Sequence, residues 1–156
     1  MFSESSMFAG IWGSIALVIH LAWVYAIGIK MNSLLPTVIR PGTKFFKIHW
    51  WLLLGIILFA YNILSYSTYS PLNSNSEMIF FLGFGLIVVY LEFSIWMFAA
   101  RMLESMIEGE IVNRSDSLKA FFCFWIFPIG VWYIQPAVHR VLAKYEPNAA
   151  GTDSVA

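Results

Sequence analysis

The sequence predicts an all-α polytopic membrane protein, a four-helix transmembrane bundle. Composition is the first observation: 60% of the 156 residues are hydrophobic and 12% are charged, whereas a soluble domain is about half apolar and about a quarter charged. The second is the stretch 78–100, which carries one charged residue, Glu92, and at ~1.5 Å per residue is long enough to cross a bilayer. Three further apolar segments accompany it. We expect one helical domain over residues 1–145 and a disordered tail over 146–156, with spans at about 7–29, 48–66, 78–100 and 118–141.

The first two segments have features typical of membrane helices. Residues 7–29 repeat small side chains at four-residue spacing, a pattern that lets helix backbones approach closely in membranes. Residues 48–66 begin with Trp50 and Trp51 and end with Tyr66, as expected for a helix that meets both membrane–water interfaces. Both segments are therefore predicted to cross the bilayer.

The third segment is predicted to continue as a helix beyond the membrane. An apolar stripe persists past Arg101, and Gly109 is the predicted stop because glycine tolerates the left-handed conformation that ends many helices. Ser115 or Asp116 is the predicted N-cap of the next helix, which begins near Leu118.

The fourth segment, residues 118–141, is short in apolar residues and contains Pro128. A proline inside a helix removes one backbone hydrogen bond and kinks the helix, which membranes tolerate where neighbours compensate. We expect either a proline-kinked span or a re-entrant segment that turns at 128–130 and returns to the side it came from.

Basic residues give an orientation, because they accumulate in cytoplasmic loops. They are frequent in segments 30–47 and 101–119 and absent from 67–77, so the first and third connections are predicted to be cytoplasmic. Four full spans then put both termini outside. A re-entrant fourth segment would leave the C-terminus in the cytoplasm, as Arg140 and Lys144 favour.

Two ionisable side chains, His20 and Glu92, lie inside apolar segments and form the candidate intramembrane polar pair. By residue count Glu92 lies ~12 Å and His20 ~13–14 Å from the same predicted membrane face. An isolated charge there costs ~2.5–3.5 kcal/mol on insertion scales. Three interpretations stay open: a structural hydrogen bond between two helices, a proton-handling or ligand-binding pair, and no contact.

The other candidate site residues are polar groups near the membrane. Asn62 and Gln135 are expected to make interhelical hydrogen bonds, and His49 and Arg101 are expected at the interface. No P-loop, H-E-x-x-H or G-x-S-x-G motif occurs. We therefore expect no catalytic residue, cofactor or metal site, and a net charge of zero gives no indication of nucleic-acid binding.

The stretch 121–140, FFCFWIFPIGVWYIQPAVHR, contains the phrase F-P-I-G-x-W-x-I-Q-P. It resembles the C-terminal signature of uncharacterised small four-helix membrane proteins of Bacteroidota-type bacteria. Ala137 departs from the pattern, since a basic residue is usual there. The resemblance covers about the last third of the chain, counting the acidic segment before the signature. It implies a bacterial inner-membrane protein and no particular activity.

We expect a small non-catalytic protein integral to the bacterial inner (plasma) membrane, acting as a structural, assembly or regulatory component of a membrane complex. Its expected partners are the lipid bilayer and a membrane protein or a second copy of the chain. The alternative is a small transporter or proton pathway that uses His20 and Glu92. The third and least favoured class is an enzyme of lipid metabolism at the cytoplasmic interface.

Overall fold

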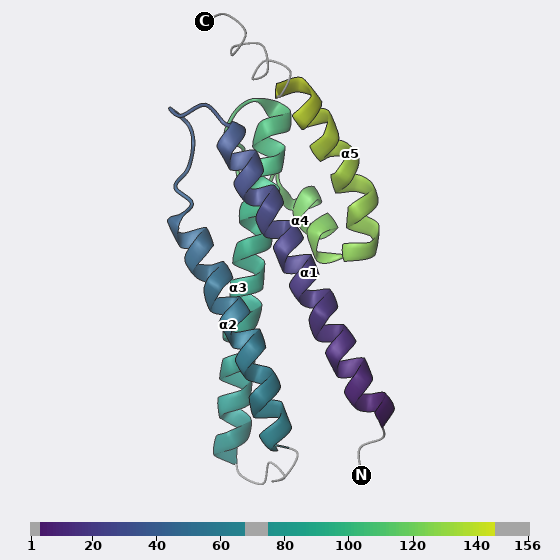
Figure 1. Cartoon of the computed structure of the whole chain (residues 1–156). Coiled ribbons are helices and arrows are strands. Elements are labelled where there is room, and N and C mark those ends of the chain that lie inside the picture. Colours follow the sequence, from purple (N-terminus) through teal and green to yellow (C-terminus); the bar gives the residue numbers. More distant parts are fainter. Residues whose placement is uncertain (1–3, 68–74, 146–156) are drawn as a thin grey trace, which may run out of the picture. The chain divides into compact units, whose positions relative to one another are not determined.

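The computed structural model describes residues 4–67 and 75–145. Every regular element in these two ranges is an α-helix (Figure 1), so the predicted all-α class is confirmed. Backbone but not side-chain placement is described for residues 4–11, 60–67, 75–77, 80 and 127–129. The predicted tail over 146–156 lies outside the described residues.

Three long helices precede two shorter ones in the described chain. Their bounds are α1 Glu4–Leu34, α2 Lys44–Ser67, α3 Asn75–Glu108, α4 Leu118–Trp125 and α5 Phe127–Tyr145. Two stretches, Trp12–Leu34 of α1 and Phe81–Glu108 of α3, are long and apolar enough to cross a membrane. The helices α1, α2 and α3 extend beyond the predicted spans at both ends, because a helix can continue into residues that no longer follow the apolar pattern.

The chain divides into two compact units, and α1 and α3 each contribute to both. Unit 1 contains residues 1–22 and 44–95, and unit 2 contains residues 23–43 and 96–156. In the described part of unit 1, the buried apolar side chains come from all three of its helices: Leu21, Phe46, Leu53, Leu91 and Ile95.

Unit 2 has a larger buried core. Its buried side chains recur at helical spacing on α1, α3, α4 and α5. Aromatic rings join these stripes: the rings of Trp23 and Phe124 lie 5.5 Å apart, and those of Trp96 and Phe121 lie 6.4 Å apart. The buried core includes Val24, Ile27, Met31, Ala99, Met102, Leu103, Met106, Ala120, Phe124, Ile134, Ala137 and Val141.

The end of α3 and the start of α4 at Leu118 agree with the sequence, whereas the N-cap of α4 does not. Gly109 has a φ of 82°, and its N–H donates to the Ser105 carbonyl at 2.9 Å, which confirms the predicted stop. The N-cap of α4 is Ser117, so the prediction of Ser115 or Asp116 was wrong. Ser117 Oγ donates backward to the Arg114 carbonyl at 3.0 Å and gives α4 no side-chain cap.

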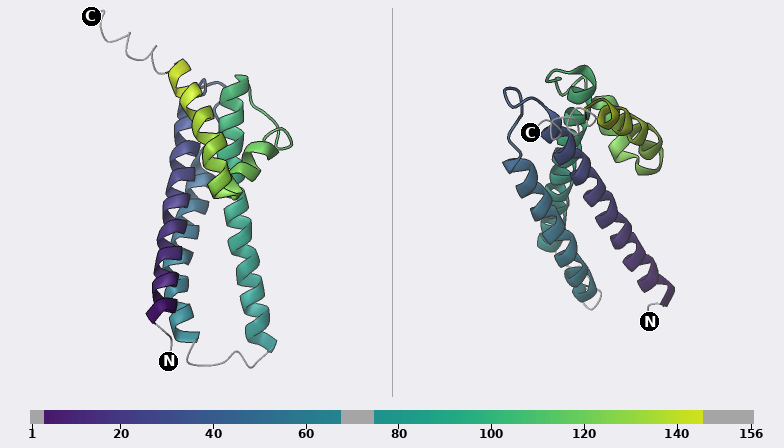
Figure 2. Two further views of the ribbon diagram at one scale, coloured as in Figure 1. Left: turned by 90° about the vertical axis from the view of Figure 1, so that its right-hand side faces the viewer. Right: turned by 45° about the horizontal axis from the view of Figure 1, so that its top comes forward.

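The fourth apolar segment is not one helix. Ile126, with φ −92° and ψ 72°, separates α4 from α5 (Figure 2). Pro128 is the second residue of α5, where the N–H that proline lacks has no intrahelical partner to lose. A Cβ at Gly130 would overlap the Cys123 carbonyl oxygen, so α5 folds back closely on α4 only because residue 130 is glycine.

Candidate functional site: polar contacts of α2 in unit 1

The first turns of α2 carry a polar contact to α3. His49 Nδ1 and Ser94 Oγ lie 2.8 Å apart and share a hydrogen bond. The Tyr90 ring meets the His49 ring edge-on, with centroids 5.8 Å apart. Tyr90 and Ser94 are four residues apart on α3 and therefore lie on the same face. His49, predicted only as an interface residue, is thus held between a hydroxyl and an aromatic ring.

The next residue of α2 bonds to α1 instead. Trp50 Nε1 donates to the Leu21 carbonyl at 3.1 Å. Successive helical residues point about 100° apart, since one turn takes about 3.6 residues. His49 and Trp50 can therefore reach two different helices. Leu53, which is fully buried, lies four residues after His49 and three after Trp50, so its side chain points between theirs one turn further along α2.

The predicted pair lies in the same unit. His20 is buried on α1 next to Leu21, and Glu92 is half-buried on α3 two residues before Ser94. Leu91 and Ile95, one turn apart, form the buried stripe beside Glu92. The coupling of His20 with Glu92 stays a prediction.

The remaining predicted residues lie elsewhere. Gln135 is exposed on α5, and the side chain of Asn62 lies outside the described residues, so both interhelical hydrogen bonds stay predictions. Arg101 is half-buried in unit 2, where its Nε and Nη2 donate to the Val112 carbonyl at 3.3 and 3.2 Å. Its guanidinium therefore holds the loop after α3.

Ser105 completes this attachment. Its Oγ accepts the Val112 N–H at 3.2 Å in a buried position, so α3 satisfies both backbone polar groups of Val112. Sequence reasoning missed Ser94 and Ser105. Each is a single hydroxyl within an apolar helix, which is the one signal that could have identified them as interhelical or loop contacts.

The contacts of α2 are suited to holding helices together. A histidine hydrogen-bonded to a serine can also accept or release a proton, but nucleophilic use of the serine needs a third group that orients the imidazole. The contacts described for the His49 ring are the hydrogen bond with Ser94 and the edge of the Tyr90 ring. Neither is a carboxylate that would orient the imidazole for such a reaction. No group of three or more His, Cys, Asp and Glu side chains placed to hold a metal ion occurs among the described residues.

No protein-family model, curated protein or solved structure matches the chain.

Proposed function

We propose that this chain is an integral protein of a bacterial inner membrane that serves, without catalysis, as a structural or assembly component of a membrane complex. The observation that carries the proposal is the broad apolar surface of unit 1. Large apolar side chains are more than half exposed along both α2 and α3, among them Leu58, Phe59, Leu82, Leu86 and Tyr90. Apolar side chains exposed in this number on two neighbouring helices favour a covering of lipid or another protein.

The low burial of the apolar helices supports a membrane location over the core of a soluble fold. In the most apolar window of Trp12–Leu34, 28% of residues are buried, and in that of Phe81–Glu108, 17% are buried. A core helix of the same composition would be mostly buried. The length of α2, 24 residues or ~36 Å at 1.5 Å per residue, suits a third crossing.

The break at Ile126 supports a re-entrant fourth segment. Outward-facing apolar side chains gather near the turn between α4 and α5, where Phe122, Trp125 and Trp132 are 47, 50 and 83% exposed. The far end of α5 instead exposes His139 and Arg140. A hairpin with an apolar turn and a polar far end fits a segment that dips into one leaflet and returns.

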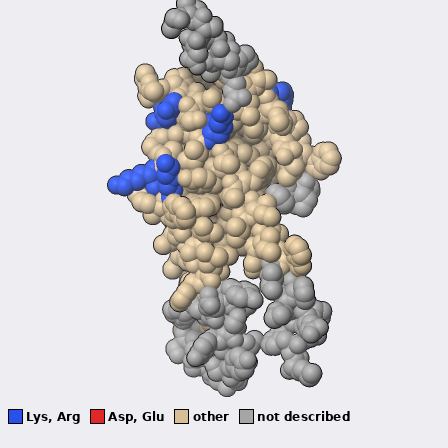
Figure 3. Space-filling view, in the orientation of Figure 1, with Lys and Arg blue, Asp and Glu red and all other residues tan. Residues whose placement is uncertain are grey.

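Charge supports the same arrangement. If α1, α2 and α3 cross and the α4–α5 hairpin returns, all nine lysine and arginine residues of the chain lie on one side of the membrane. A fourth crossing would put Arg140 and Lys144 on the opposite side, against the cytoplasmic bias of basic residues. On the side of the molecule drawn in Figure 3, each charged side chain in view is a lysine or an arginine.

Two sequence features support the bacterial assignment and the assembly role. The resemblance of residues 121–140 to the signature of small inner-membrane proteins favours a bacterial plasma membrane. The small residues repeated along α1 favour close approach of another helix, first of all one of the same chain, and they would equally admit a helix of a partner.

Membrane extraction and cysteine labelling test the proposal. The full chain should stay in the membrane fraction after alkaline carbonate washing. Single cysteines are placed at Ser74 and Ser115 in a Cys123→Ala background and are labelled in whole cells with an impermeant thiol reagent. We expect labelling at position 74 only. Release by carbonate would contradict an integral protein, and labelling at Ser115 alone would reverse the orientation.

A reporter fused after Lys144 tests the hairpin. We expect the reporter to be cytoplasmic, because a hairpin returns the chain to the side on which α4 begins. An external reporter would instead establish the fourth full crossing, and with it the four-span bundle.

The second candidate function is a small transporter or proton pathway. It is favoured by the burial of His20, an ionisable side chain, within an apolar helix. The test is a variant that replaces His20 and Glu92 by Phe and Leu. A stable variant that loses the cellular role would support proton handling, whereas a stable and active one would support the structural role.

A further inference from the structure

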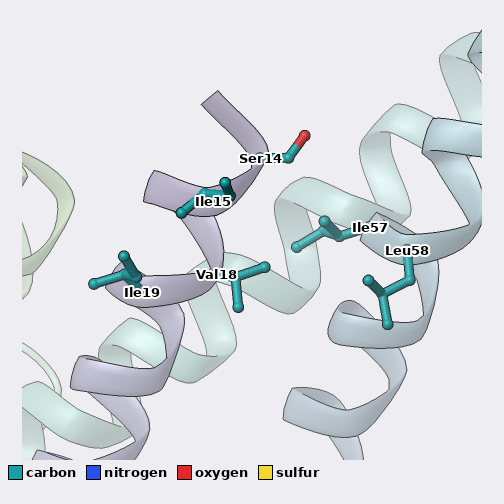
Figure 4. Close-up of a pocket in the computed structure, with 6 residues that line it drawn as sticks. All are labelled: Ser14, Ile15, Val18, Ile19, Ile57 and Leu58. Carbon is teal, nitrogen blue, oxygen red and sulfur yellow. The ribbon is translucent and has the colours of Figure 1, made fainter. Parts of the chain in front are cut away.

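Unit 1 contains an apolar groove between α1 and α2. Its volume is 310 Å³. Val18 of α1 faces α2, and Ile57 points toward α1 across the groove (Figure 4). The lining residues are Ser14, Ile15, Val18 and Ile19 of α1 and Ile57 and Leu58 of α2.

The register of the two helices fixes where the groove lies along them. The bond from Trp50 Nε1 to the Leu21 carbonyl joins α2 to α1. Ile57 lies seven residues beyond Trp50, and Ser14 lies seven residues before Leu21, as expected for antiparallel helices. The groove is therefore about two turns, or ~10 Å, deeper along α2 than this bond.

A basic and aromatic stripe leads from the start of α2 to the groove. Lys47, Trp51 and Leu58 are spaced by four and then seven residues, so they share one face of the helix. Lys44 is one turn before Lys47, and both lysines are exposed. From Lys47 to Leu58 the helix rises ~16 Å, close to the ~15 Å depth of one hydrocarbon leaflet.

We propose that the groove binds one acyl chain of an anionic phospholipid whose phosphate is held by Lys44 and Lys47. This inference rests on the proposed function, since it requires the chain to be in a bilayer. The acyl chain would extend from the interface at Trp51 down to Ile57 and Leu58. It would cover apolar side chains that α1 and α2 leave open toward each other.

Charge complementarity selects an anionic lipid over a zwitterionic one. No aspartate or glutamate occurs between residues 5 and 76, so no nearby acid in the sequence competes for the two lysines. A lysine near a membrane surface attracts anionic headgroups. The groove supplies the affinity for the acyl chain, and the two lysines supply the preference for an anionic headgroup.

The experiment is native mass spectrometry of the delipidated full chain in mild detergent. Dioleoyl phosphatidylglycerol and dioleoyl phosphatidylcholine, which share acyl chains, are the probes. The wild-type protein should retain phosphatidylglycerol in preference to phosphatidylcholine. The double variant Lys44→Gln with Lys47→Gln should lower that preference roughly fivefold per lysine. The matched control, Arg114→Gln with Lys144→Gln, removes two exposed charges elsewhere and should leave it unchanged. Equal retention of both lipids by wild type, or an equal loss in the control, would overturn the proposal.

A second pair of variants tests the groove itself. Val18→Trp fills the groove and should reduce retention of both lipids several-fold. Leu86→Trp, on an exposed position of α3, should not. If Val18→Trp disturbs the helical content measured by circular dichroism, Leu58→Trp at the exposed rim replaces it. Unchanged retention in a folded groove variant would overturn the proposal. A chain that stays in the membrane but fails these tests leaves the proposed function intact, whereas release by carbonate refutes both.

Discussion

Units 1 and 2 are built from the same two long helices and are stabilised differently. In unit 2, α3, α4 and α5 present buried stripes that meet in a core containing Phe124 and Leu103, both fully buried. In unit 1, the described side chains bury little, and hydrogen bonds from His49 and Trp50 join α2 to its neighbours. Close packing therefore dominates where the helices are short, and sparse polar contacts dominate where they are long and apolar.

If the chain lies in a bilayer, as proposed above, the difference reflects how lipid changes the value of an apolar residue. Between lipid-facing helices there is little hydrophobic driving force, because lipid tails are as apolar as leucine. Van der Waals packing and single hydrogen bonds then decide which faces meet. The predictions below separate the two kinds of stabilisation, each measured as the free energy of unfolding of the full chain in detergent.

The largest effect is expected at Gly130. Gly130→Ala puts a Cβ into the Cys123 carbonyl, and overpacking against backbone should cost about 4 kcal/mol or more, or prevent folding. Gly83→Ala is the control, because a Cβ there meets nothing within 4 Å; it should be neutral or stabilising by up to about 1 kcal/mol. A Gly130→Ala variant as stable as wild type would mean that α5 does not fold back on α4.

Two phenylalanines should sharpen the contrast next. Phe124 is fully buried in unit 2 and Phe59 is 64% exposed in unit 1. Phe124→Ala should cost about 3–5 kcal/mol through the cavity it leaves, whereas Phe59→Ala should stay within about 0.5 kcal/mol. Equal losses would indicate that Phe59 is covered by another part of the chain or by a second copy.

A smaller effect is expected from two serine hydroxyls, one buried at Ser105 and one half-buried at Ser94. Ser105→Ala leaves the buried Val112 N–H without its acceptor and should cost about 1–3 kcal/mol. Ser94→Ala removes the partner of His49 and should cost about 0.6 and at most about 1.7 kcal/mol, as for interhelical bonds in membranes. The comparison fails if Ser94→Ala is the more damaging of the two.

The smallest effect is expected from the candidate pair. In a double-mutant cycle with His20→Phe and Glu92→Leu, a direct contact should give a coupling energy of about 0.6 kcal/mol. Strictly additive losses would show that the two side chains act independently. Leu82→Ala combined with His20→Phe serves as the additive reference, since Leu82 is 67% exposed.

The sequence predicted the three long helices well, together with the end of α3 and the start of α4. Apolar runs mark α1, α2 and α3, and Gly109 ends α3 because its positive φ favours glycine. The break at Ile126 was not predictable from Pro128 alone, since a proline in the first turn and a proline in mid-helix look alike in a sequence. The contact between residues 123 and 130 decides between them, and it depends on tertiary packing.

The site was less predictable than the fold. His49 was recognised as polar, but its partner Ser94 is 45 residues away in the chain. Helical periodicity gives the face of each residue on its own helix and says nothing of which faces meet. The division into two units was also hidden, because α1 and α3 each pass from one unit to the other as a single unbroken helix.

The interleaving of the two units has a consequence for synthesis on the ribosome. Unit 1 uses residues up to 95, whereas unit 2 joins residues 23–43 to the chain after 95. The buried faces of Val24, Ile27 and Met31 therefore have to wait for α4 and α5, the last helices to be translated. A message truncated after Glu108 would yield every residue of unit 1 and only part of unit 2. The apolar stripes on α1 and α3 would then lack the α4 and α5 residues that cover them. Such a product is the kind that quality-control proteases remove.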